Sequence, residues 1–251
     1  MYIIENMDPP TIFSFGFRCS SAAILKKLGL KTESYPFDWL VSDLSVIQKC
    51  FSDNFKEFLN IENYQRKYSN TYEMADSNQG FICDEHLMVN MFYQPENEQN
   101  VENTYQYKLA MNHHNIKETK DHEYYTRCVD RMRDIFNKDS NKIYLHICRL
   151  ITLERYEREH EDLLIQLKNF DEFIGYHVKG SLKGLIFILV KNKNNDNPSI
   201  RELLYESEKT KTKIFIVFTN PHFIDAGEDF MGNCYEEIDF IKNKIMESNN
   251  E

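Results

Sequence analysis

The chain has 251 residues, of which 41% are hydrophobic and 14% aromatic, enough for a substantial core in one large domain or two small ones. Its formal net charge of -10 disfavours a broad affinity for nucleic acid or an anionic membrane, because both are polyanions. No apolar run reaches membrane-spanning length, and the N-terminus lacks the features of a signal peptide. We therefore expect an intracellular, cytoplasmic protein with no nucleic-acid or membrane partner.

The first thirty residues predict a strand followed directly by a helix. A short apolar run at Thr11–Phe15 is typical of a buried strand, and Gly16 ends it. A helix is expected from about Ser20 to Leu28, because apolar residues recur on one of its faces, with Gly29 as its stop.

The next thirty residues predict an extended segment and two more helices. Pro36 disfavours helical backbone at Tyr35. Asp43 is expected to cap a second helix, and a short helical segment follows at Phe55–Leu59. The second helix turns three apolar residues inward, namely Leu44, Ile47 and Phe51.

The pattern weakens between residues 60 and 115, which we interpret as an irregular insert. Two candidate strands, His86–Phe92 and Tyr105–Met111, are separated by the charged loop Gln94–Asn103. A helix over His122–Asn137 is much clearer, because its apolar residues form one stripe at helical spacing.

Strands and helices then alternate to the end of the chain. The expected elements are strand Lys142–Cys148, helix Leu153–Leu167, strand Leu185–Val190, short helix Ser199–Ser207, strand Lys213–Phe218 and helix Tyr235–Met246. Apolar strands alternating with amphipathic helices favour parallel strands covered on both faces. We predict a single α/β domain over residues 1–251, with a three-layer, mainly parallel, Rossmann-like sheet, helices on both faces and the irregular insert.

The number and spacing of the cysteines limit which disulfide or metal sites the chain can form. The six residues are scattered, with no CxxC pair and no histidine at metal-ligand spacing. We expect reduced thiols, and neither a metal nor another cofactor. The positions are Cys19, Cys50, Cys83, Cys128, Cys148 and Cys234.

Cys19 is a candidate nucleophile because it lies between the first strand and the start of the first helix. Unpaired N–H groups and the positive end of the helix dipole both favour an ionised sulfur there. Ligands also gather beyond the carboxyl ends of parallel strands. The alternative is a small buried residue that packs the turn.

Asp38 is a candidate orienting carboxylate for a catalytic histidine. It lies in the tetrapeptide PFDW, which contains the only tryptophan, Trp39. Equally open is a structural role, in which Asp38 caps the following helix or accepts from nearby backbone N–H groups while Phe37 and Trp39 join the core.

His113 and His114 are the best-placed candidates for the base, because they end an apolar segment rather than lie on a charged face. An exposed loop role or simple packing is equally open for them. His146 lies inside a predicted strand, so we expect it in the core.

A third group of residues suits an anionic substrate. Arg131 on the predicted helix and Arg18 beside Cys19 could clamp a phosphate or a carboxylate, and the strand–loop–helix around Gly16 also suits phosphate. The glycine-rich nucleotide-binding patterns are absent. The candidate substrate-binding residues are Gly16, Arg18, Ser20, Trp39 and Arg131.

Several motifs together resemble a known family. The segments SFGFRCSSAAILKKLGL, SYPFDWLVSDLSVI, NHHN and YYTRCVDRMRDIF resemble the domain-of-unknown-function family described as putative papain-like cysteine peptidases, found in bacteria and large DNA viruses. The resemblance is dense over residues 12–59 and moderate over 105–148. It implies Cys19 as nucleophile, His113 or His114 as its histidine and Asp38 as the carboxylate.

We therefore expect a cysteine-dependent hydrolase that acts on a peptide or other amide bond through a Cys-His-Asp site. The alternative is a transferase or binding domain for a phosphorylated or nucleotide-sugar ligand in glycan metabolism, with Cys19 structural. A catalytically inactive interaction module is the third possibility.

Overall fold

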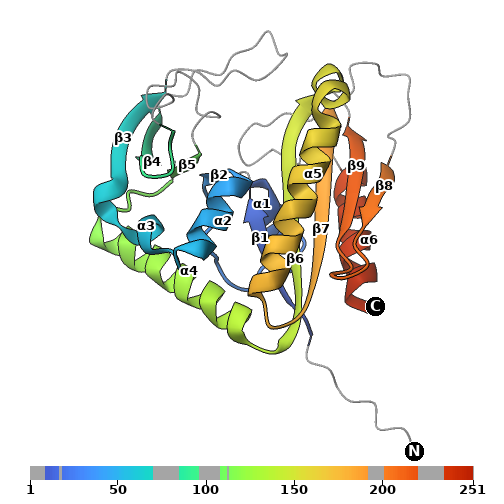
Figure 1. Ribbon diagram of the computed structural model, residues 1–251, viewed down its shortest axis with the longest axis horizontal. Coiled ribbons are helices and arrows are strands. Elements are labelled where there is room, and N and C mark those ends of the chain that lie inside the picture. The colour runs from blue at the N-terminus through green and yellow to red at the C-terminus, as the bar shows by residue number, and fades with distance from the viewer. Residues whose placement is uncertain are drawn as a thin grey trace, which may run out of the picture.

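The computed structural model describes residues 9–16, 19–69, 85–95, 108–111, 113–191, 201–219 and 235–250. Two sheets organise this part of the chain (Figure 1). The larger has five strands in the order β1-β6-β7-β9-β8, and the smaller has four in the order β2-β5-β4-β3. The predicted α/β class is confirmed.

The larger sheet is mainly parallel, as the sequence predicted. Strands β1 (Thr11–Gly16), β6 (Ser140–Thr152), β7 (Gly180–Lys191) and β9 (Lys213–Thr219) run parallel to one another. Strand β8 (Arg201–Glu206) pairs with β9 in the antiparallel sense at one edge, and β1 forms the other edge. The carboxyl ends of the parallel strands therefore share one side of the sheet.

Helices pack against both faces of this sheet (Figure 1). Apolar residues of α1 (Ser20–Lys27) and α6 (Tyr235–Asn250) join Leu145 and its neighbours in the core on one face. On the other face, α5 (Leu153–His177) contributes Leu167, Phe170 and Ile174 to a second core. That core also contains residues of α2 (Leu44–Ser52) and α4 (Thr119–Asn137).

The stretch interpreted as an irregular insert supplies most of an antiparallel sheet. Its strands are β2 (Val41–Ser42), β3 (Tyr64–Ser69), β4 (Glu85–Asn90) and β5 (Leu109–Met111). Helix α3 (Lys56–Leu59) and a 3-10 turn at Ile61–Asn63 lead into β3. Strand β3 escaped prediction because its sequence, YQRKYS, is too polar to give an apolar alternation. Much of the predicted strand Tyr105–Met111 lies outside the described residues, and so does the predicted loop Gln94–Asn103 apart from its first two residues.

One predicted element was wrong. The helix expected at Ser199–Ser207 is the strand β8, whose residues pair with β9 from Arg201↔Val217 to Glu206↔Lys213. The segment RELLYE is rich in good helix formers, but pairing with the free edge of β9 overrides that local preference.

Other helices differ from prediction in their bounds. Helix α4 begins at Thr119 rather than His122, and α5 continues ten residues beyond Leu167. The extension of α5 keeps the apolar spacing, because Phe170 and Ile174 are both buried on the sheet. No helix in the described segments is long and apolar enough to cross a membrane.

A buried polar cluster joins α5 to the sheet. Tyr144 Oη and Thr212 Oγ1 donate to Asp171 Oδ1 at 2.9 and 2.6 Å, and Thr210 Oγ1 donates to Oδ2 at 2.6 Å. Gly184 makes room for it, since a Cβ there would lie 2.3 Å from Tyr144 Cζ. The cluster supplies hydrogen-bond donors to the carboxylate of Asp171, a residue that is only 2% exposed.

Candidate functional site

Cys19 lies directly before α1, at the carboxyl end of β1. Its backbone is already helical, with φ -61° and ψ -10°, and its carbonyl accepts the first helical hydrogen bond from Ala23 N at 2.8 Å. Ser21 fixes this turn, because its Oγ donates to Phe15 O at 3.4 Å and accepts from Ile147 N at 2.9 Å. The first turn of α1 is thus tied to the end of β1 and to the neighbouring strand β6.

The other described cysteines have a different environment from Cys19. Cys19 is half-buried, whereas Cys50, Cys128 and Cys148 are buried. Burial raises the pKa of Cys148 to about 12 and also raises the pKa values of Cys50 and Cys128. These three thiols are therefore poor nucleophiles near neutral pH. Cys83, Cys234 and the candidate Arg18 lie outside the described residues.

Asp38 anchors the loop that covers the outer edge of β1. Its Oδ1 accepts from Ser14 Oγ at 2.6 Å, and its Oδ2 accepts from Tyr35 N at 2.7 Å and from the ammonium of Lys31. Phe37, beside Asp38, packs against Phe15 with ring centroids 6.0 Å apart. Because Ser14 and Phe15 face opposite sides of the strand, the loop straddles the sheet edge.

The structural role expected for Asp38 as an alternative has direct support. The carboxylate is 1% exposed, and within the described residues its donors are Ser14, Lys31 and Tyr35, without a histidine. Burial raises the pKa of Asp38, against the opposing effects of Lys31 and the hydrogen bonds. Phe37 joins the core, as that alternative expected, whereas Trp39 is only half-buried.

His114 is paired with a carboxylate that the sequence interpretation missed. Its Nδ1 lies 3.1 Å from Asp121 Oδ1, while Asp121 Oδ2 accepts from Asn115 N at 2.7 Å. The ring stacks on Tyr124 with centroids 4.9 Å apart and planes 19° apart. His114 is therefore held by the first turn of α4, and within the described residues no hydrogen-bond partner occupies its Nε2. A contact with the Cys19 thiol is not among its described interactions.

The role of Asp121 could have been recognised only from the true start of α4. A helix predicted from His122 leaves Asp121 in the preceding loop, whereas a start at Thr119 places it in the first turn, where carboxylates are favoured by the helix dipole. A carboxylate there faces the loop that enters the helix, which carries both candidate histidines. His113, the other candidate, is exposed.

His146 is a core residue, as expected. It is 2% exposed and its Nδ1 lies 2.7 Å from Phe15 O, so this nitrogen carries the proton. Burial lowers the pKa of His146 to about 4, which keeps the ring neutral at physiological pH.

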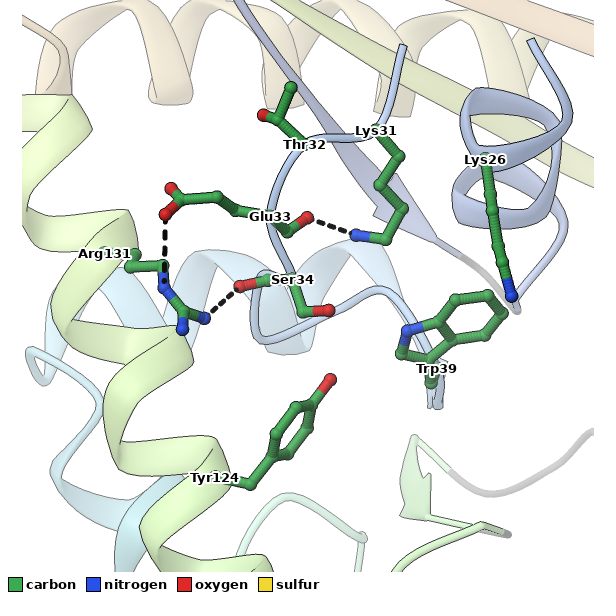
Figure 2. A pocket seen from close by; sticks show the side chains of 8 residues that line it. All are labelled: Lys26, Lys31, Thr32, Glu33, Ser34, Trp39, Tyr124 and Arg131. Atoms are coloured by element: carbon green, nitrogen blue, oxygen red, sulfur yellow. Dashed lines mark hydrogen bonds and ion pairs between the residues drawn. The ribbon is translucent and has the colours of Figure 1, made fainter. Parts of the chain in front are cut away.

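A pocket of about 480 Å³ lies between α1, the loop after it and α4 (Figure 2). It brings together two predicted substrate-binding residues, Trp39 and Arg131, with Tyr124, whose ring stacks on His114. The remaining lining residues are Lys26, Lys31, Thr32, Glu33 and Ser34.

Most of the charges in this pocket are already paired. Arg131 donates to Ser34 O at 2.9 Å and lies 3.7 Å from Glu33 Oε1. Lys31 is bound by the buried Asp38 and also donates to Glu33 O at 2.5 Å. Lys26 extends along α1 toward the indole of Trp39 (Figure 2), and no hydrogen bond or ion pair of its ammonium occurs within the described residues.

The remaining predicted residues lie near the start of α1 but do not line the pocket. Gly16 ends β1, and its carbonyl accepts from Ser42 Oγ, which links the two sheets. Ser20 is the first residue of α1. Within the described segments, no group of three His, Cys, Asp or Glu side chains is arranged to hold a metal ion.

Comparisons with known proteins give a family and one viral relative. Residues 10–194 match the model of the family described as "Putative papain-like cysteine peptidase (DUF1796)". A 62-residue segment is 45% identical to an uncharacterized protein of Acanthamoeba polyphaga mimivirus. That segment is 22% of this chain and 27% of the relative, so the match spans about a quarter of the relative's length. No solved structure matches.

Proposed function

The chain belongs to the family described as putative papain-like cysteine peptidases, and from that premise we propose that it is a cysteine-dependent hydrolase of a peptide or other amide bond. Cys19 is the nucleophile. Its position carries the proposal: the thiol precedes a helix at the carboxyl end of a parallel strand, and it is the only cysteine in the described residues that is not buried.

His114 and Asp121 supply the acid–base chemistry in this proposal. His114 Nε2 takes the thiol proton as the sulfur attacks the substrate carbonyl, and it returns the proton to the leaving amine. Asp121 at Nδ1 fixes the ring tautomer and stabilises the imidazolium that forms. Water then hydrolyses the thioester. The mechanism requires Nε2 of His114 to come within hydrogen-bond reach of Cys19 Sγ in the substrate complex.

The start of α1 supplies the oxyanion site. The first N–H groups of a helix have no partner within the helix, and they point toward the position that Cys19 occupies. Such donors stabilise the negative oxygen of the tetrahedral intermediate. Asp38 has a positioning role here, because it fixes the loop that carries Trp39 toward the pocket.

Alkylation of the native protein tests the assignment of Cys19. Iodoacetamide at low concentration near pH 7 should modify Cys19 much faster than Cys50, Cys128 or Cys148, as read by mass spectrometry of peptides. Hydrolysis of a fluorogenic peptide library should be lost in Cys19→Ser and kept in Cys148→Ser. Equal labelling of Cys19 and the buried cysteines, or activity that survives in Cys19→Ser, refutes the proposal.

A further inference from the structure

We infer that the pocket between Lys26, Trp39 and Tyr124 binds an acidic side chain of the substrate, a glutamate or aspartate carboxylate, on the same side of α1 as Cys19. This inference rests on the proposed function, because it assigns the substrate class to that site. It follows from the shape, the charge and the position of the pocket.

The shape suits a side chain with an apolar stem and a polar end. A volume of about 480 Å³ lies within the range of small-ligand sites. Trp39 and Tyr124 offer ring surface for methylene groups, while Thr32 and Ser34 are polar residues elsewhere in the lining. Such a mixture of rings and a few polar groups is typical of sites that orient a ligand.

The charge suits a single negative group. The lining contains three cations, of which Lys31 is bound by Asp38 and Arg131 lies beside Glu33. Lys26 alone has its charge unmatched within the described part of the chain. One unmatched ammonium balances one carboxylate. A diphosphate carries at least two charges and is matched less well, which disfavours a nucleotide sugar in this pocket.

The position places this side chain a few residues from the reacting bond. Lys26 follows Cys19 by seven residues, which is nearly two turns, so both lie on the same face of α1. The rise between them is about 10 Å, and a helical lysine leans back toward the N-terminus, which shortens the gap. An extended peptide advances about 3.3 Å per residue, so the acidic residue lies roughly two or three positions from the attacked carbonyl.

Fluorescence tests binding without catalysis, because Trp39 is the only tryptophan in the chain. The probe is a blocked acetyl-Ala-Ala-Glu-Ala-amide peptide, titrated into full-length Cys19→Ser protein, with the Gln-containing peptide and uridine diphosphate glucose as comparisons. We expect the Glu peptide to change the Trp39 emission and to bind roughly five- to tenfold more tightly than the Gln peptide. Equal affinity for the two peptides, or tight binding of the nucleotide sugar alone, overturns the inference.

Charge variants identify the cation. Lys26→Gln should remove the Glu preference, and Lys26→Glu should reverse it. Lys49→Gln is the matched control, because Lys49 is also an exposed lysine in the last turn of a helix but does not line the pocket. Added salt should weaken the Glu preference of the wild type. A preference that survives in Lys26→Gln overturns the assignment of Lys26.

The two proposals fail in different ways. If Cys19 is alkylated rapidly but the Glu and Gln peptides bind equally, the acidic-substrate inference is refuted and the hydrolase proposal stands. If instead the Glu preference depends on Lys26 while Cys19 is as unreactive as Cys148, the hydrolase proposal is refuted and an acidic-peptide binding site remains.

Discussion

Ser14 on the edge strand β1 donates a 2.6 Å hydrogen bond to Asp38, a residue 24 positions later in the loop that wraps that edge. The same carboxylate binds Lys31, and neither side chain of this pair has much contact with water, at 0% and 10% exposure. The loop that carries Trp39 therefore depends on a buried ion pair.

Replacement of Asp38 by Asn should destabilise the fold by about 3 kcal/mol, because it leaves the Lys31 ammonium buried without its counter-charge. The double variant Asp38→Asn/Lys31→Gln should recover much of that loss, because the burial cost of both charges is then removed. Urea denaturation of the two single variants and the double variant measures the coupling. Additive losses would show that the pair contributes nothing as a pair.

His146 should make stability depend on pH. Its pKa is lowered from 6.5 to about 4 in the folded chain, so between these values the unfolded chain binds more protons. Stability should therefore fall as the pH drops from 6.5 toward 4, by about 3 kcal/mol from this residue. His146→Asn should remove that component of the slope in thermal or urea unfolding. The same substitution at His113, an exposed histidine, serves as the matched control.

Gly184→Ala should destabilise the protein by about 2–3 kcal/mol, because the added methyl meets Tyr144 and Thr212 in a packed interior. Ser181→Ala, on the same strand but at an exposed hydrogen bond, should change the free energy of unfolding by less than about 0.5 kcal/mol. Comparable effects of the two variants would contradict the close packing around the Asp171 cluster.

Asp121→Asn should lower the rate of amide hydrolysis by roughly tenfold or more, and His114→Ala by about 10² to 10⁴-fold. Loss of the orienting carboxylate should lower kcat more than it changes KM, because Asp121 acts through the His114 ring. His113→Ala is the matched control and should keep the wild-type rate. A wild-type kcat in Asp121→Asn would remove Asp121 from the mechanism.

The alternating elements after residue 140 could be predicted because each strand is apolar along its length and each long helix has a distinct apolar face. Strand β8 could not, because its pairing with β9 is a tertiary preference that a local sequence does not carry. Strand β3 was missed because its sequence is mostly polar, although its first residue, Tyr64, is buried.

The candidate site was predictable where chemistry depends on local position. Cys19 follows from a strand–helix junction that can be read in the sequence, and its reactivity stays a prediction. Trp39 and Arg131 were grouped as substrate-binding residues; they line one pocket, and their role in binding a substrate stays a prediction. Asp121 could not be identified, because its partnership with His114 depends on a helix start that lies three residues before the predicted one.

The loop at residues 35–38 also has a consequence for how this chain behaves in a crowded solution. Strand β1 is the outermost strand of its sheet, and its unpaired side would otherwise offer the apolar segment TIFSF as a template for another chain. Phe37 on one face and Asp38 on the other hold the loop across that side. Variants that release this loop, such as Asp38→Asn, should therefore self-associate before they lose their helices, which light scattering beside circular dichroism measures.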